Sequence, residues 1–520
     1  MMPWVLAAAL LGGTLAWLAP ASGRVARLLV ALLPLATLVL AAQMAVQLAA
    51  IPDSDMNASR TTPAVALARG FPIYAGPDGG PIIDFMYGPL AAVAFLPVAV
   101  ATTPSGALLI AAVVNVLAFF LPMLWLHALV LGASRIAVAA MLCFGLLVLH
   151  DLGLRFSAMS IHADAPSLGL AAVACLALMG SRPRLAMSAL FAALAVWTKQ
   201  TTVPLLVALP LWVAATWGLR RALVYVVWLA LALALVSAVL LAVFGIDDVV
   251  FNMVTLPGHM PWYDETTQGR WPAAMRSLGW LLYANALPAA IVVGVLVLDV
   301  RRGDGVRGTL QRRPWLLLVL VAVAMAPLAV VGGAKIGGYL NTHSVTSYFL
   351  LAAATCALGA FASAGSRRRT VGEWVLVGLL AVLVLPVVLD PRTPAATAAA
   401  VTRLAHWSDN QQEQAFVWAR RHPGTVYLPW NPLVTLLAEG RLDHSEIGAW
   451  NRDLAGVPIG DAQLRRFVPR GARLLAVRPR HDATTWLPDP TARLPEFHER
   501  TTEPGLPGWD VFARDAAEAP

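Results

Sequence analysis

The chain has 520 residues, of which 59% are hydrophobic and 13% are charged, and its mean hydropathy is +0.70. A soluble globular protein carries about 25% charged residues, so this composition excludes that class and indicates a polytopic membrane protein. The net charge of +8 comes with arginines in short clusters between apolar segments, which is typical of membrane topology rather than of nucleic-acid binding. The three cysteines fall inside apolar runs and are expected to be packing residues, not a disulfide framework.

Apolar segments along the chain predict a mainly α-helical transmembrane bundle. A helix needs about 20 apolar residues to cross the hydrocarbon core, so the shorter segments are expected to extend into their loops. Segment 88–100 is too short and too proline-flanked to cross, and we expect a helix lying at the interface. The twelve expected spans are at about 3–19, 25–50, 106–130, 136–150, 166–180, 185–198, 202–218, 222–244, 276–299, 314–333, 345–362 and 371–389.

Basic residues set the expected orientation of the bundle. If loop 51–87 faces outward, the inward loops hold fifteen basic residues and the outward loops hold seven. The positive-inside rule therefore places this loop outside the cytoplasm, with both termini on the same side. Counting segment 88–103 as a crossing would send the arginine cluster 367–369 outward, which disfavours that alternative.

One acidic outward loop is the polar interruption at 51–90. It carries Asp53, Asp55, Asp78 and Asp84 in a chain with few charges. Ionisable groups at the edge of a membrane bundle are by default candidates for function. The alternative is that some of them simply sit in turns beside proline and glycine.

Further polar residues fall at the expected outer edge of the bundle. Lys199 ends one span and Lys335 follows another, and they are the only two lysines among 37 basic residues. Lysine at two places in an arginine-rich chain indicates a compact cation for a phosphate, with chance and snorkelling as the alternative. Loop 245–275 is long, aromatic and acidic, which predicts contact with sugar or acceptor, or else an interfacial anchor. The other candidates at this edge are Tyr87, Arg155, His162, Asp164, Tyr339, Asn341 and His343.

After residue 390 the character of the chain changes. Residues 391–520 hold no segment long enough to cross and many of the remaining charges. Helical spacing at 399–421 and 431–440 alternates with short strand patterns at 424–430 and 472–479. We therefore expect a transmembrane domain at 1–390 and a small soluble α/β domain at 391–520.

The order of these features resembles the GT-C class of membrane glycosyltransferases. It is close to the polyprenyl-phosphate-sugar-dependent branch, which includes mannosyltransferase-like and aminoarabinose-transferase-like proteins. The resemblance covers about 1–390 and, more weakly, the C-terminal domain, and Gly88 stands where the pattern usually has proline. The matching segments are Asp55 after an early span, ALARGFPIY at 66–74, YGPL at 87–90, IHADAP at 161–166, WTKQ at 197–200 and the glycine-rich stretch 332–349.

This resemblance implies a glycosyltransferase that moves a sugar from a polyprenyl-phosphate donor to a lipid, glycan or protein acceptor. It implies a cell (inner) membrane location, with the active site and C-terminal domain extracytoplasmic. Deprotonating the acceptor needs a carboxylate base, for which Asp55 is preferred and Asp53 stays open, with Asp164 as a second catalytic acid. Asp55, Asp164 and His162 could also hold Mg or Mn. Phosphate or substrate binding falls to Lys199, Lys335, Tyr87, Arg155, His162, Tyr339, Asn341 and His343.

Two other classes of function remain open on the sequence alone. One is a transporter or flippase for lipid-linked glycans, which would be expected to carry ionisable residues near the bilayer midplane, where these spans have almost none. The other is a non-catalytic scaffold for cell-envelope assembly.

Overall fold

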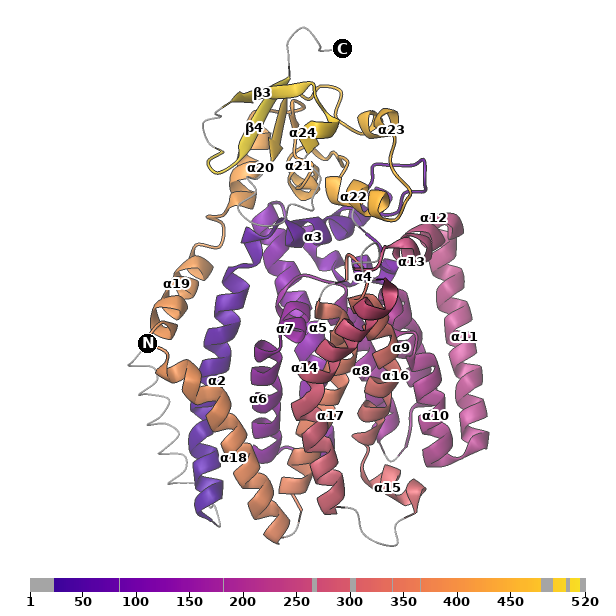
Figure 1. Cartoon of the computed structure of the whole chain (residues 1–520), viewed down its shortest axis with the longest axis vertical. Helices are drawn as coiled ribbons and strands as arrows, with labels where there is room; N and C mark the ends of the chain where they lie inside the picture. Colours follow the sequence, from indigo (N-terminus) through magenta and orange to yellow (C-terminus); the bar gives the residue numbers. More distant parts are fainter. Residues whose placement is uncertain are drawn as a thin grey trace.

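The structure is a computed structural model that describes residues 23–83, 85–180, 182–263, 269–299, 305–338, 340–364, 366–477, 490–501 and 506–514. The expected span at 3–19, and the candidates Asp84 and Tyr339, lie outside the described residues. The described chain is a long helical bundle with a small α/β domain at one end (Figure 1). We call this end of the bundle the domain end. The mainly helical fold expected from the sequence is confirmed.

Eight helices or helix combinations of the described chain are long and apolar enough to cross a membrane, or nine if one bent pair counts as a span. They differ in their surroundings. The central helix α17 is almost entirely buried, whereas α11 exposes Leu231, Leu235 and Val239 on its outer face, as expected for contact with lipid. The long bundle helices are α2 (Arg24–Ala49), α5 (Pro104–Leu131), α10 (Leu205–Trp217), α11 (Leu219–Phe244), α14 (Arg270–Asp299), α16 (Leu316–Gly333), α17 (Ser344–Ala362) and α18 (Ser366–Leu389).

Fewer helices reach the crossing length than the twelve apolar segments predict, and the reason is local. Helices α8 (Asp164–Met179) and α9 (Leu185–Thr198) have 16 and 14 residues, short of the ~20 that span a bilayer. Helix α6 (Arg135–His150) bends by 100° into α7 (Leu152–Met159). The bend occurs where the Asp151 side chain accepts a hydrogen bond from the Leu154 N–H at 2.7 Å and so begins a new helix.

Short helices gather at the domain end of the bundle. The predicted interfacial helix is present as α4 (Pro89–Ala94) followed by the 3₁₀ turn η2 (Leu96–Val100), both too short to cross. Around it lie α3 (Asp55–Ala68), α12 (Ile246–Val250), the π-helical turn η4 (Phe251–Thr255) and α13 (Leu256–His259). At the opposite end, α15 (Val306–Arg312) joins α14 to α16 (Figure 1).

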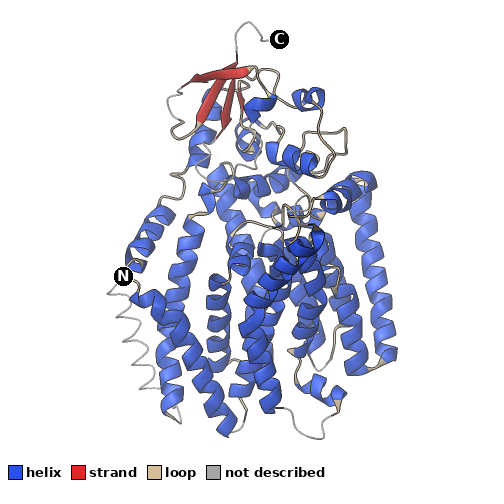
Figure 2. Ribbon diagram, viewed as in Figure 1, coloured by secondary structure: helices blue, strands red, loops and turns tan. Residues whose placement is uncertain are grey.

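The α/β domain begins after α18. Helix α19 (Thr393–Ala405) lies against α2 and leads into the domain (Figure 1). The strands of the described chain form one four-stranded sheet, at the far end of the domain in Figure 2, in the order β1 (Val426–Tyr427), β2 (Leu474–Val477), β4 (Asp510–Arg514) and β3 (Phe497–Thr501). The first pair is parallel and the other two are antiparallel. The domain helices are α20 (Gln411–Arg421), α21 (Pro432–Glu439), α22 (Glu446–Leu454), α23 (Asp461–Arg466) and α24 (Pro490–Arg493).

The domain shares its hydrophobic core with the end of the bundle. One cluster of buried apolar side chains runs from Val65 on α3 and Ile73 in the following loop to Trp418 on α20 and Leu433 on α21. Burying these side chains together contributes roughly 1.5–3 kcal/mol for each large residue. The α/β domain is therefore packed onto α3 and the loop that follows it, which positions the site described next.

Candidate functional site

The site is built around Asp164, the first residue of α8, whose side chain is completely buried. Its carboxylate forms an ion pair with the ammonium group of Lys199. The Asn341 amide donates to Asp164 Oδ2 at 2.7 Å, and the Ser157 hydroxyl donates to the same oxygen at 3.1 Å. A buried carboxylate is stable only when it is paired and hydrogen-bonded in this way, so these three donors hold Asp164 as an anion.

His162 extends this network toward Tyr87. Its Nδ1 lies 2.8 Å from Asp164 Oδ2, and its Nε2 lies 2.8 Å from the Tyr87 hydroxyl. Burial lowers the pKa of His162 to about 4, with nearby Arg60 and Lys199 adding to the effect and Asp164 opposing it. The ring is therefore neutral at pH 7. Because a carboxylate can only accept, we assign the proton to Nδ1, which leaves Nε2 to accept from the Tyr87 hydroxyl.

Two buried asparagines fix the loop that carries His162. The Asn57 side chain accepts from the Ile161 N–H at 3.0 Å, and the Asn115 side chain accepts from the His162 N–H at 3.3 Å. The Asn115 amide also donates to the Ser157 and Ala158 carbonyls at the end of α7. Each asparagine thus replaces the backbone hydrogen bonds that this loop lacks.

Lys199 is placed by the end of α9, and Gly88 is part of that placement. The Gly88 N–H donates to the Thr198 carbonyl at 3.2 Å. A Cβ at position 88 would lie only 1.8 Å from the Trp197 carbonyl oxygen. The chain therefore has glycine here because the backbone approaches α9 too closely for any side chain. As a result Tyr87 lies beside the lysine, with the Lys199 ammonium 5.6 Å from the centre of the Tyr87 ring.

A small recess with a volume of about 10 Å³, room for about one water molecule, lies beside this network. Its polar lining comes from Arg60 on α3, Tyr87 and His162, and its apolar lining includes Phe85 and Phe95. The Arg60 guanidinium lies 5.2 Å from the centre of the Phe156 ring, and it forms no ion pair with any residue in the described ranges. Sequence reasoning missed Arg60 because it is one of many arginines, and only the fold turns it toward His162.

The structure thus brings together five of the residues expected from the sequence, which are Tyr87, His162, Asp164, Lys199 and Asn341. Others lie elsewhere. The Lys335 ammonium donates to the carbonyls of Pro257 and Gly258 at 3.1 and 2.7 Å, and so caps α13. His343 Nε2 lies 3.0 Å from the Ser277 hydroxyl on α14, and Arg155 lines a separate groove near α2.

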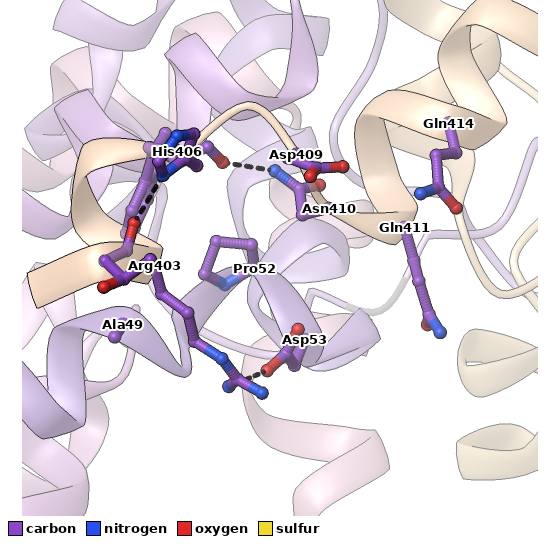
Figure 3. A pocket seen from close by; sticks show the side chains of 11 residues that line it. Ala49, Pro52, Asp53, Arg403, His406, Asp409, Asn410, Gln411 and Gln414 are labelled. Carbon is purple, nitrogen blue, oxygen red and sulfur yellow. Dashed lines mark hydrogen bonds and ion pairs between the residues drawn. The ribbon is translucent and has the colours of Figure 1, made fainter. Parts of the chain in front are cut away.

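The two acids of the first loop face the α/β domain instead. Asp55 begins α3 and accepts from the Gln412 amide at 2.8 Å. Asp53 forms an ion pair with Arg403 at 3.1 Å, inside a cavity of about 480 Å³ between α2 and the α19–α20 connection (Figure 3). Neither carboxylate has a contact with Asp164 among those seen in the described chain.

The residues proposed as metal ligands do not fit a divalent cation. Within the described ranges, no three histidine, cysteine or acidic side chains are grouped so that they could hold one. Asp164 holds the Lys199 ammonium on one oxygen and three donors on the other. The position beside Asp164 that Mg or Mn would need is thus filled by a lysine.

Comparison with known proteins supports the fold independently of the site. No protein-family model matches the sequence, and no curated protein matches it. Among solved structures, the chain is similar to ArnT from Cupriavidus metallidurans bound to undecaprenyl phosphate, with a TM-score of 0.52 and 13% identity over 93% of this chain and 98% of that chain. The apo state of the same protein matches over the same shares with a TM-score of 0.51 and 15% identity. The resemblance expected from the sequence is confirmed at the level of the fold, and the chain has the polytopic GT-C-like fold of ArnT.

Proposed function

We propose that this protein is a membrane glycosyltransferase that takes its sugar from a polyprenyl-phosphate donor. The observation that carries the proposal is the cavity where Arg60 and the Tyr87 hydroxyl meet beside the Asp164–Lys199 pair. Because the recess has room for only about one water molecule, the phosphate of a lipid-linked sugar would contact the Arg60 guanidinium at its edge and would not be enclosed by it. The ArnT structure of the same fold was determined with undecaprenyl phosphate bound, which supports this class of ligand.

The reaction moves one glycosyl group. An acceptor oxygen or nitrogen forms a bond to the anomeric carbon, the bond from that carbon to the phosphate oxygen breaks, and the electron pair leaves with the phosphate. The acceptor's proton goes to a carboxylate. Arg60 is suited to stabilise the charge that develops on the leaving phosphate, because it forms no ion pair in the described chain that would compete.

The roles of the two acids differ in this proposal. Asp164 is completely buried and paired with Lys199, so it positions His162 and Tyr87 and does not act as the base. Asp55 is partly exposed at the start of α3 and accepts from the Gln412 amide, so its carboxylate is less enclosed than that of Asp164. We assign the base to Asp55 and the remaining candidate, Asp53, to the ion pair with Arg403.

The proposed orientation places this site on the extracytoplasmic face of the inner membrane. The excess of arginines in the loops at the opposite end supports it. The α/β domain would then lie outside the cytoplasm, above the site.

The test is glycosyl transfer by the purified full chain in lipid nanodiscs. Donors are radiolabelled polyprenyl-phosphate pentose and hexose, and the acceptors are an extract of envelope lipids and glycans. Arg60→Gln and Asp55→Asn are expected to lose at least 100-fold in transfer, while Arg420→Gln, on the exposed surface of the α/β domain, keeps it. A wild-type chain that binds the donor but transfers no sugar would favour the scaffold alternative. Full activity of Asp55→Asn would remove Asp55 from the mechanism.

A further inference from the structure

A second polar groove lies on the lipid-facing side of the bundle, away from the Arg60 cavity. It has a volume of about 350 Å³ and runs between α2, the end of α18 and the first half of α19. We call it the Arg155 groove, after the residue of α7 at its inner wall. Its polar lining consists of Gln43, Gln47, Arg155, Asp390, Thr393 and Thr397.

The groove presents polar groups where a membrane helix is expected to be apolar. Gln43 and Gln47 are four residues apart on α2, so both amides lie on the same face of a helix that is apolar from Leu38 to its end apart from these two residues. The Gln43 Oε1 atom is buried and has no hydrogen-bond partner among the residues that the structure describes. Leaving an amide oxygen unsatisfied in such a place costs about 1–3 kcal/mol, which a ligand with hydroxyl or amide donors would relieve.

Arg155 supplies the charge. Its side chain is partly buried, and across the described ranges its guanidinium forms no hydrogen bond or ion pair, although the Asp151 carboxylate four residues earlier is close enough to interact with it electrostatically. Asp390 at the rim is strongly exposed and is turned toward Arg392, at 4.0 Å. The groove therefore offers one available cation together with amide and hydroxyl groups.

Its depth in the bundle indicates the source of the ligand. The lining residues of α2 and α18 belong to the last turns of two membrane-length helices, which is the level of lipid headgroups. Leu385 and Leu389 are exposed beside it on α18, as a surface for acyl chains. A molecule bound here would place a phosphate on Arg155 and its apolar chains along α2 and α18.

The groove also reaches toward the candidate active site. Arg155 and Gln47 line a neighbouring cavity of about 230 Å³ that ends at Phe156. On its other side the Phe156 ring contacts Arg60 and lies 5.7 Å from the His162 ring. Phe156 thus lines the neighbouring cavity and also contacts two residues of the candidate site.

We infer that the Arg155 groove binds the phosphate-bearing, hydroxyl-rich headgroup of a membrane lipid that arrives laterally and is distinct from the glycosyl donor. The shared chemistry is a phosphate on a guanidinium, which a lipid or free phosphate could supply, and the position of the groove favours the lipid. This inference does not depend on transfer activity.

The experiment labels the full chain in nanodiscs with a photoactivatable phosphatidylglycerol and maps the labelled peptides. Wild type is expected to be labelled within 42–47 or 385–397. Arg155→Gln should reduce this labelling at least fivefold, whereas Arg155→Lys keeps most of it. The matched control Arg220→Gln removes an exposed arginine at the start of α11, at the end of the bundle away from the α/β domain, and should leave the labelling unchanged.

Three outcomes would overturn the inference. The first is equal labelling of wild type and Arg155→Gln when both elute as folded monodisperse protein. The second is labelling by photoactivatable phosphatidylcholine as strong as by phosphatidylglycerol, with no change in Arg155→Gln. The third is loss of labelling in millimolar inorganic phosphate at constant ionic strength, which would identify a site for free phosphate instead of a lipid.

Discussion

Arg452 of the α/β domain donates to the carbonyls of Ala75 and Pro77, at 2.7 and 3.0 Å, in the loop that leads to Tyr87. Its guanidinium also lies 5.1 Å from the centre of the Phe251 ring. The arginine is almost completely buried, and it connects α22, the loop at 70–88 and the η4 turn. Its role is to position the loop, since it does not reach the Arg60 cavity.

Arg452→Gln should therefore make this loop more mobile without removing any side chain of the candidate site. We expect faster hydrogen exchange at residues 75–79 and a several-fold rise in KM for the donor, with a smaller change in kcat. Hydrogen–deuterium exchange and steady-state kinetics measure the two effects. Arg465→Gln is the control, because that arginine is half exposed and pairs only with Glu496 in the described chain. Unchanged exchange at 75–79 would contradict the role of Arg452.

Replacing Lys199 by methionine should be strongly destabilising. It leaves the Asp164 carboxylate buried without its cation, and breaking a buried pair in this way costs about 3–5 kcal/mol. The double variant Asp164→Asn, Lys199→Met removes both charges and is expected to recover much of the stability but little transfer. Thermal unfolding in detergent and the transfer assay separate these outcomes.

Lys335 is the natural comparison for Lys199. Its ammonium caps the α13 carbonyls at the surface, so Lys335→Met should cost less than tenfold in transfer and about 1 kcal/mol or less in stability. Equal losses from the two lysine variants would mean that Lys335 has a part in the site.

Tyr87→Phe deletes the hydroxyl and keeps the ring. It leaves His162 Nε2 buried without its donor, at a cost of about 1–3 kcal/mol. If the hydroxyl also contacts the donor phosphate, KM should rise more than kcat falls. Tyr283→Phe is a matched control, because that tyrosine is 78% exposed on α14. A Tyr87→Phe chain with wild-type stability would contradict the loss of the His162 hydrogen bond, and one with wild-type KM would contradict a contact between the hydroxyl and the donor.

His162 makes the stability of the protein depend on pH in a defined window. Its pKa is about 4 in the folded chain and 6.5 in the unfolded reference. The unfolded chain therefore binds a proton first as the pH falls, so this stabilisation is complete above pH 6.5 and is lost toward pH 4. The loss is on the order of 3 kcal/mol.

The measurement compares wild type with His162→Gln by thermal unfolding between pH 7.5 and 4.5. Wild type should lose more stability than the variant across pH 6.5 to 4.5. His444 has a pKa lowered by burial to about 3 and titrates in both proteins, so its contribution cancels. Parallel curves for the two proteins would show that His162 is not buried as a neutral ring.

The fold could be predicted from the sequence because long apolar segments leave few alternatives in a membrane. The break at Asp151 was missed because a single capping side chain decides it. At the site, Asp164, His162 and Lys199 were identified from the order of motifs, but their pairing depends on how α8 packs against α9. Lys335 has the same residue type and a similar position at a helix end, yet local carbonyls direct it elsewhere.

The two buried asparagines of the candidate site could not be predicted from the sequence. Asn57 and Asn115 bear no charge and break no apolar period strongly, so nothing distinguishes them from ordinary helix residues. Only the loop at 160–163, which needs acceptors for its N–H groups, reveals why they are there.

The Ser445 N–H donates to the Ile82 carbonyl at 2.8 Å, joining two stretches of chain that are synthesised more than 360 residues apart. A ribosome must therefore finish nearly the whole polypeptide before the loop at 70–88 acquires its final neighbours. During biogenesis the nascent bundle would be inserted but inactive, and it would mature only when its last segment had been translated and delivered to the same side of the membrane.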